Sequence, residues 1–136
     1  MFKYNTYNHV FLNVLKPTAI NEYVPLPEFE KKGVSVYLKR EDLVFPLASG
    51  NKWRKLKYNF KALKTSSATG MLTFGGAYSN HLAAAAALAA QEQIPIVGIV
   101  RGEELATKSL NPTLSQCQAK GMQLVFVSRA EYKLKE

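Results

Sequence analysis

Cysteine and histidine are nearly absent from this chain of 136 residues, which has one cysteine and two histidines. Because Cys117 has no second cysteine to pair with, an intramolecular disulfide and a cysteine-rich metal site are both excluded. A zinc site would need carboxylates beside His9 or His81, and the sequence offers no such arrangement. We therefore expect no bound metal. The scarcity of cysteine fits a reducing compartment, and we expect a cytoplasmic protein.

Long apolar runs are missing as well. The longest wholly apolar stretch, from Leu82 to Ala90, is far shorter than the roughly 20 residues that a membrane span needs. The first residues, from Met1 to Asn5, lack the apolar core of a signal peptide, so we expect neither a membrane partner nor export. With 47% hydrophobic and 21% charged residues, the composition is that of a soluble globular protein.

Acidic residues are missing from one region of a chain whose formal net charge is +8. Between Lys52 and Lys64 there are six basic residues and no acidic one. Such a run is one pattern found in noncatalytic modules that bind nucleic acid, and we keep this function as an alternative. The solvated face of a helix has the same composition, so we do not expect nucleic acid as a partner.

An amphipathic helix is predicted over residues 51–64, directly after Gly50. At about 100° per residue, the stripe that would face the core holds one lysine among four apolar residues: Lys52, Trp53, Leu56, Phe60 and Leu63. Burial disfavours the ammonium form of a lysine, and a desolvated lysine is a nucleophile that forms Schiff bases. The alternative is that Lys52 extends into solvent from the first turn and has no chemical role.

Helices and strands alternate from residue 51 onward with short connections between them. After the helix at 51–64 we expect strands at 71–74, 94–100 and 122–127, and helices from about 79 to 90, from 112 to 120 and from 128 to 135. This order predicts an α/β fold in which an open parallel sheet carries helices on both faces. Before residue 51, only a strand at 34–38 is predicted, and the prolines at 17, 25 and 27 interrupt regular structure.

A second candidate site follows the predicted strand at 71–74. Gly75 and Gly76 allow a ligand to approach the backbone, and Ser79, Asn80 and His81 stand at the start of the next helix. Free N–H groups and the positive end of the helix dipole attract a carboxylate or a phosphate there. An ordinary tight turn capped by Ser79 or Asn80 is the alternative.

Several segments in the right order resemble the 1-aminocyclopropane-1-carboxylate (ACC) deaminase/D-cysteine desulfhydrase family. They are residues 38–43, 49–52, 54–56, 75–76 and 79–81, with the sequences LKREDL, SGNK, RKL, GG and SNH. The resemblance implies a two-domain pyridoxal-phosphate (PLP) enzyme of fold type II, the tryptophan-synthase-β fold. It also implies PLP as the cofactor, a small amino acid as the substrate and a homodimer for the full-length protein.

The resemblance also implies roles for five residues. Lys52 matches the lysine that binds the cofactor covalently, and Lys55 matches a lysine that reaches the cofactor phosphate. Asn80 matches an asparagine beside the 3′ oxygen of the cofactor that also helps to hold the substrate. Ser79 matches a catalytic serine near the substrate carboxylate, and His81 stands in the group that cradles this carboxylate, where some members have glutamine.

The chain is much shorter than family members and stops where roughly the first half of one would end. We therefore expect an N-terminal fragment or a truncated product, with residues 1–50 belonging to the larger domain and residues 51–136 forming an incomplete small domain. The glycine-rich phosphate loop and the partner of the pyridine nitrogen would lie in the missing part. For this reason we expect residues 1–136 alone to be inactive.

For the full-length protein we expect a PLP-dependent deaminase or lyase. The substrate would be D-cysteine, giving pyruvate, ammonia and hydrogen sulfide, or ACC, whose deamination opens the ring. A racemase on the same fold is an alternative, as are an inactive truncated product and the nucleic-acid-binding module.

Overall fold

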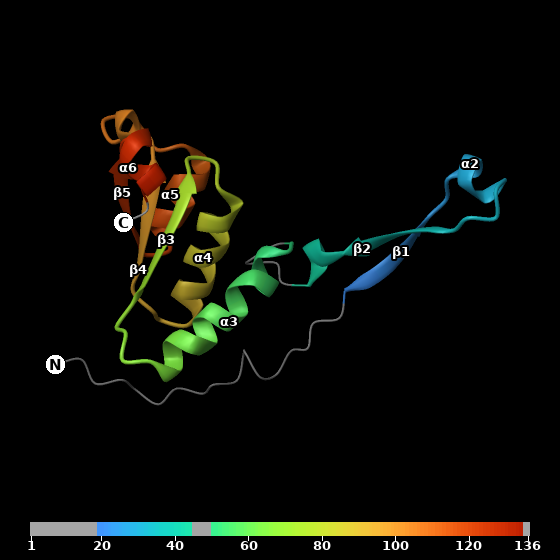
Figure 1. Ribbon diagram of the computed structural model, residues 1–136, viewed down its shortest axis with the longest axis horizontal. Helices are drawn as coiled ribbons and strands as arrows, with labels where there is room; N and C mark the ends of the chain where they lie inside the picture. The colour runs from blue at the N-terminus through green and yellow to red at the C-terminus, as the bar shows by residue number, and fades with distance from the viewer. Residues whose placement is uncertain (1–18, 45–49, 135–136) are drawn as a thin grey trace.

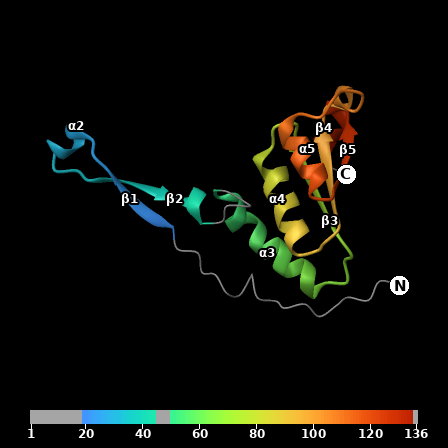
Figure 2. The ribbon, with the colours of Figure 1, turned by 180° about the vertical axis from the view of Figure 1, so that it is seen from behind.

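The computed structural model describes residues 19–44 and 50–134. The described chain has two parts, an antiparallel hairpin and an α/β unit, and the hairpin extends away from the α/β unit (Figures 1 and 2). Ser49 of the SGNK segment and the proline at position 17 lie outside the described residues. No helix in the described ranges is long and apolar enough to span a membrane.

The hairpin pairs β1 (Ile20–Val24) with β2 (Val36–Arg40), and the short helix α2 (Pro27–Glu30) lies between them. Strand β2 begins two residues later than the sequence predicts, and β1 and α2 were not predicted. The prolines were interpreted as interruptions, but Pro27 occupies the start of α2, where its missing N–H and fixed φ fit the first turn.

Apolar side chains of the hairpin are exposed on the described surface. Ile20 and Tyr37, for example, are 63% and 60% exposed. An isolated two-stranded hairpin is only marginally stable in water. Beyond β2, the short 3₁₀ helix η1 (Glu41–Leu43) contacts the α/β unit, where Glu41 accepts a hydrogen bond of 2.7 Å from Nε of Arg54.

The α/β unit contains a parallel sheet with the strand order β3 (Met71–Gly76), β4 (Ile96–Arg101) and β5 (Met122–Val127). Residue Ile96 pairs with Met71 on one side and with Met122 on the other. The predicted parallel arrangement of the three strands is confirmed. Position 98 in the middle strand has no room for a larger residue, because a Cβ there would lie 2.6 Å from the sulfur of Met122.

Helices cover both faces of this sheet, as the sequence predicts. On one face, α4 (Asn80–Gln91) contacts β3 and β4, and α5 (Pro112–Ala119) packs against α4 and β5. The short helix α6 (Arg129–Leu134) lies on the opposite face, where Tyr132 contacts the ring of Phe74 edge-on. Helix α3 (Lys52–Thr65) packs against α4, and the short 3₁₀ helix η3 (Glu103–Leu105) follows β4.

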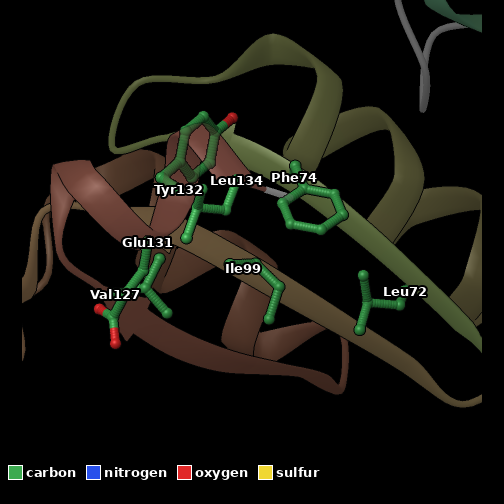
Figure 3. A pocket seen from close by; sticks show the side chains of 7 residues that line it. All are labelled: Leu72, Phe74, Ile99, Val127, Glu131, Tyr132 and Leu134. Carbon is green, nitrogen blue, oxygen red and sulfur yellow. The ribbon is translucent and has the colours of Figure 1, made fainter. Parts of the chain in front are cut away.

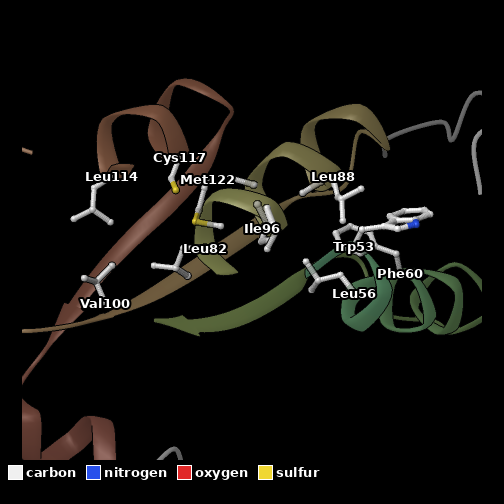
Figure 4. Packing of buried hydrophobic residues seen from close by; sticks show 14 residues of the cluster. Trp53, Leu56, Phe60, Leu82, Leu88, Ile96, Val100, Leu114, Cys117 and Met122 are labelled. Carbon is white, nitrogen blue, oxygen red and sulfur yellow. The ribbon is translucent and has the colours of Figure 1, made fainter. Parts of the chain in front are cut away.

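The core lies between the sheet and the helices on the α4 face (Figure 4). Alanines fill most of α4, and the run from Ala84 to Ala89 is buried almost completely. Small side chains on two sides of α4 let both the sheet and α3 approach it closely. From α3, the predicted apolar stripe contributes three buried side chains to this core: Trp53, Leu56 and Phe60.

Candidate functional site

The first half of the candidate site is the turn that joins β3 to α4. Gly75 is buried against α4, because a Cβ at this position would lie 2.6 Å from Cγ of Leu82 and 2.7 Å from Oγ of Ser79. A larger residue would therefore push the turn away from the helix. Gly76 is different, since the nearest heavy atom to its Cβ position is Nη2 of Arg101 at 4.0 Å. Space beside the backbone thus exists at Gly76 and not at Gly75.

Ser79 is the N-cap of α4, as the sequence predicts. Its Oγ accepts a hydrogen bond of 3.2 Å from the N–H of Leu82, and its backbone is extended as at most N-caps. A hydroxyl that accepts this bond keeps its own hydrogen for another partner. Asn80 begins the helix and is exposed, so its amide faces solvent at the same end of α4.

Asn111, which precedes the helix α5, holds the same turn through its side chain. Its Oδ1 accepts a hydrogen bond of 2.9 Å from the N–H of Leu114, which caps α5. Its Nδ2 donates to the carbonyl oxygen of Ala77 at 3.0 Å. A cavity of about 220 Å³ lies beside this bond and is lined in part by Tyr78 and Lys108.

The second half of the candidate site is the start of α3. Gly50 has a φ of +71°, a left-handed conformation that favours glycine and turns the chain into the helix. Lys52 is half-buried and its Nζ donates a hydrogen bond of 3.1 Å to Oδ1 of Asn51, while Lys55 is exposed. Lys57, which was predicted on the solvated face, is half-buried as well, so burial alone does not separate Lys52 from the other lysines of α3.

His81 connects the two halves electrostatically. Its Nε2 lies 2.8 Å from Oγ1 of Thr73, a buried residue of β3 that sequence reasoning did not single out. Burial lowers the pKa of His81 below its ordinary value of 6.5, and the positive charges of Lys52 and Lys55 lower it further. Helix α3 packs against α4, so the lysines in its first turn are on an element that contacts the helix of His81. Lys52 and the residues from Ser79 to His81 at the start of α4 are 27 to 29 positions apart in the sequence.

The basic face of α3 is partly neutralised. Arg54 pairs with Glu41, and Lys64 pairs with Glu92 at the end of α4. The ammonium of Lys57 lies 4.6 Å from the ring centre of Tyr58. These contacts are typical of a solvated helix surface and reduce the positive charge available to a nucleic-acid backbone.

A cavity of about 450 Å³ lies on the opposite face of the sheet, under α6 (Figure 3). Its lining is apolar apart from one carboxylate and one phenol, and comprises Leu72, Phe74, Ile99, Val127, Glu131, Tyr132 and Leu134. Hydrogen bonding to Ser128 lowers the pKa of the Glu131 carboxyl, first through the side chain of Ser128 and then through its backbone N–H, which donates to an Oε atom of Glu131 at 2.8 Å. The lining of this cavity therefore lacks the lysines and the helix start that make up the candidate site. In the described ranges, no group of three residues among His, Cys, Asp and Glu is placed to hold a metal ion.

The fold matches that of solved enzymes. A structure described as an ACC deaminase homologue superposes with a TM-score of 0.65 at 25% sequence identity, over 80% of this chain and 32% of that chain. No family model matches the sequence. The architecture is that of the fold-type-II pyridoxal-phosphate enzymes, and the predicted fold class is confirmed.

Sequence relatives indicate which group of enzymes within this class the chain resembles. A putative ACC deaminase of Thermotoga maritima is 37% identical over 120 residues, which are 88% of this chain and 36% of the relative. A putative mitochondrial D-cysteine desulfhydrase 2 of Oryza sativa subsp. japonica is 42% identical over 65 residues, 48% of this chain and 16% of the relative. The chain is a homologue of proteins of the ACC deaminase/D-cysteine desulfhydrase family and spans about a third of the length of the Thermotoga protein.

Proposed function

We propose that the whole protein is a PLP-dependent deaminase or lyase of a small amino acid. The candidate reactions are conversion of D-cysteine to pyruvate, ammonia and hydrogen sulfide, and deamination of ACC. The observation that carries the proposal is the packing of α3 against α4, with Lys52 and Lys55 in the first turn of α3 and His81 in the first turn of α4, where both lysines help to lower the pKa of His81. A covalently held cofactor and a substrate carboxylate need amines and anion-binding groups side by side.

The described residues fit two parts of the cofactor. Its aldehyde needs a primary amine, which Lys52 would supply from a half-buried position after the left-handed turn at Gly50. Its phosphate is anionic, and Lys55 would approach it from one turn further along α3. When bound, the cofactor supplies an electron sink that stabilises negative charge on the substrate.

The start of α4 would hold the substrate. A twelve-residue helix has a positive N-terminal end, and its first N–H groups favour a carboxylate. Ser79 can donate its hydroxyl hydrogen while its oxygen caps the helix. Asn80, exposed beside it, would contact both cofactor and substrate, and His81 would complete the group that binds the carboxylate.

The domain arrangement and the assembly are also proposals. We propose that residues 1–50 belong to a larger domain and residues 51–136 to a small α/β domain, because the described hairpin exposes apolar side chains that an adjoining domain would cover. We propose a homodimer for the whole protein, in accordance with the family resemblance.

Nucleic-acid binding is the competing proposal, and the net charge of +8 is the observation that favours it. Binding through lysines and arginines weakens steeply as salt displaces the phosphate contacts. The ion pairs of Arg54 and Lys64 argue against it, since both cations are already neutralised.

The test uses the whole open reading frame that contains residues 1–136, obtained by sequencing past codon 136. The purified protein is assayed for pyruvate and hydrogen sulfide from D-cysteine and for ammonia from ACC, and its cofactor absorbance is recorded. We expect Lys52→Ala to abolish the absorbance and nearly all turnover, while the matched control Lys57→Ala retains both. Wild-type turnover by Lys52→Ala would refute the assignment of this lysine, and salt-sensitive DNA or RNA binding without cofactor absorbance would favour the competing proposal.

A further inference from the structure

A buried hydroxyl lies directly behind the candidate site. Thr73 is 7% exposed and stands on β3, on the face of the sheet that α4 covers. Within the described ranges it is the polar residue of the core, surrounded by apolar side chains. A hydroxyl at such a depth is stable only if it is hydrogen-bonded, and Oγ1 of Thr73 lies 2.8 Å from Nε2 of His81.

This bond decides which ring nitrogen of His81 a ligand can use. Because Nε2 is engaged by Thr73, only Nδ1 is left for a group at the start of α4. A neutral imidazole carries one N–H, and the partner of one nitrogen determines which nitrogen holds the hydrogen. If Nε2 donated to Thr73, Nδ1 would present a lone pair and would repel a carboxylate.

A protonated ring carries an N–H on both nitrogens and could donate to an anion from Nδ1 in any case, but the surroundings of His81 disfavour the protonated form. Burial lowers the pKa of His81 below its ordinary value, and the positive charges of Lys52 and Lys55 on α3 lower it further. Around neutral pH the ring is therefore neutral. It can meet an anion favourably only through an N–H on Nδ1.

We propose that Thr73 is a positioning residue whose O–H donates to Nε2 and holds His81 in the Nδ1–H form, so that the ring is a neutral donor to a substrate carboxylate. The carboxylate, and with it the choice of Nδ1 as the protonated nitrogen, rests on the proposed function, whereas the contact between Thr73 and His81 does not. Serine at position 73 would keep the donor, and valine would keep the shape of threonine and remove it. Glutamine in place of His81 would offer a similar pattern, with one acceptor for Thr73 and N–H donors.

The first readout needs no cofactor. We would label the histidines of the 136-residue chain with ¹⁵N and record long-range ¹H–¹⁵N spectra of the imidazole rings at about pH 8, where a neutral ring is expected. A His9→Gln variant assigns the signals of His81. We expect a protonated Nδ1 and a bare Nε2 in the wild type and in Thr73→Ser, and a loss of this preference in Thr73→Val. A protonated Nε2 in the wild type would overturn the inference even if Thr73→Val did not fold.

The second readout is turnover of D-cysteine or ACC by the whole open reading frame. Losing a well-aimed hydrogen bond to a charged group costs about tenfold, so we expect Thr73→Val to raise KM about tenfold with a smaller change in kcat, and Thr73→Ser to restore it. A wild-type KM in Thr73→Val would overturn the role toward the carboxylate. The expected ring hydrogen together with no turnover by the wild type would refute the proposed function and leave the pairing of Thr73 with His81 supported.

Discussion

Nδ2 of Asn111 donates a hydrogen bond of 3.0 Å to the carbonyl oxygen of Ala77, so that the cap of α5 holds the turn before α4. The same side chain accepts the N–H of Leu114 through Oδ1. The side-chain amide of Asn111 thus links the start of α5 to the turn before α4, and a mutation can remove one of its two hydrogen bonds without the other.

We expect Asn111→Asp to keep the cap of α5 and to release the turn. The carboxylate retains an acceptor for Leu114, but it has no N–H for Ala77 and repels the carbonyl oxygen. Asn111→Ala should lose both bonds and about 1–2 kcal/mol of stability. Urea denaturation measures the stability, and amide hydrogen exchange at residues 76–79 measures the turn. Unchanged exchange there in Asn111→Asp would contradict the role given to Nδ2.

The two glycines of the turn should respond differently to alanine. A Cβ at position 75 would overlap Leu82 and Ser79, so Gly75→Ala should lose about 1–3 kcal/mol. Gly76→Ala meets its nearest atom at 4.0 Å and should change the stability by less than about 0.5 kcal/mol. Thermal or urea unfolding of the two variants makes the comparison. Equal losses would show that the close approach at Gly75 is not what requires glycine.

Ser79 tests the difference between a cap and a catalytic residue. Ser79→Ala should lose about 1 kcal/mol of stability with the bond to Leu82. If the proposed function is correct, turnover of the whole protein should fall further than this loss explains, even at low temperature where the variant is fully folded. Ser79→Asp is the matched control, because it keeps the cap and places a negative charge where the carboxylate would bind. If Ser79→Ala retained normal kinetics at low temperature, the serine would be a cap alone.

Most of the α/β unit could be predicted from the sequence because its periodicities are strong. The apolar stripe of Trp53, Leu56 and Phe60, the alanine-rich helix and the apolar strands each indicate one type of element. The hairpin was not predictable in the same way. Only its second strand was predicted, and neither strand packs on a core in the described structure: seven of their ten side chains are exposed and three are half-buried.

The candidate site was predictable in its parts but not in its connections. Ser79 as the cap and Lys52 at the edge of the apolar stripe follow from local rules. The hydrogen bonds of Thr73 to His81 and of Asn111 to Ala77 depend on how β3, α4 and α5 pack. A threonine in an apolar strand, on the side facing the next helix, is the signal that could have indicated the first of these bonds.

The lowered pKa of His81 predicts how stability depends on pH. The unfolded chain takes up a proton at this ring near pH 6.5, while the folded chain resists it because of burial, Lys52 and Lys55. The unfolded state therefore binds more protons below about pH 6.5, and stability falls as the pH decreases from there toward the folded-state pKa. Above about pH 7 this contribution is complete.

The experiment compares His81 with His81→Gln in a background that carries His9→Gln, so that no other histidine titrates. Urea denaturation from about pH 8 to pH 5 should show a decline for the protein with His81 and a nearly flat profile for His81→Gln. Carboxyls such as Glu41, whose pKa is lowered first by its hydrogen bond to Arg54, lose their contribution only at more acidic pH. Lys55→Gln should make the decline shallower, because one of the two charges that oppose protonation of His81 is gone. A decline that is equally steep with glutamine at position 81 would show that another group causes it.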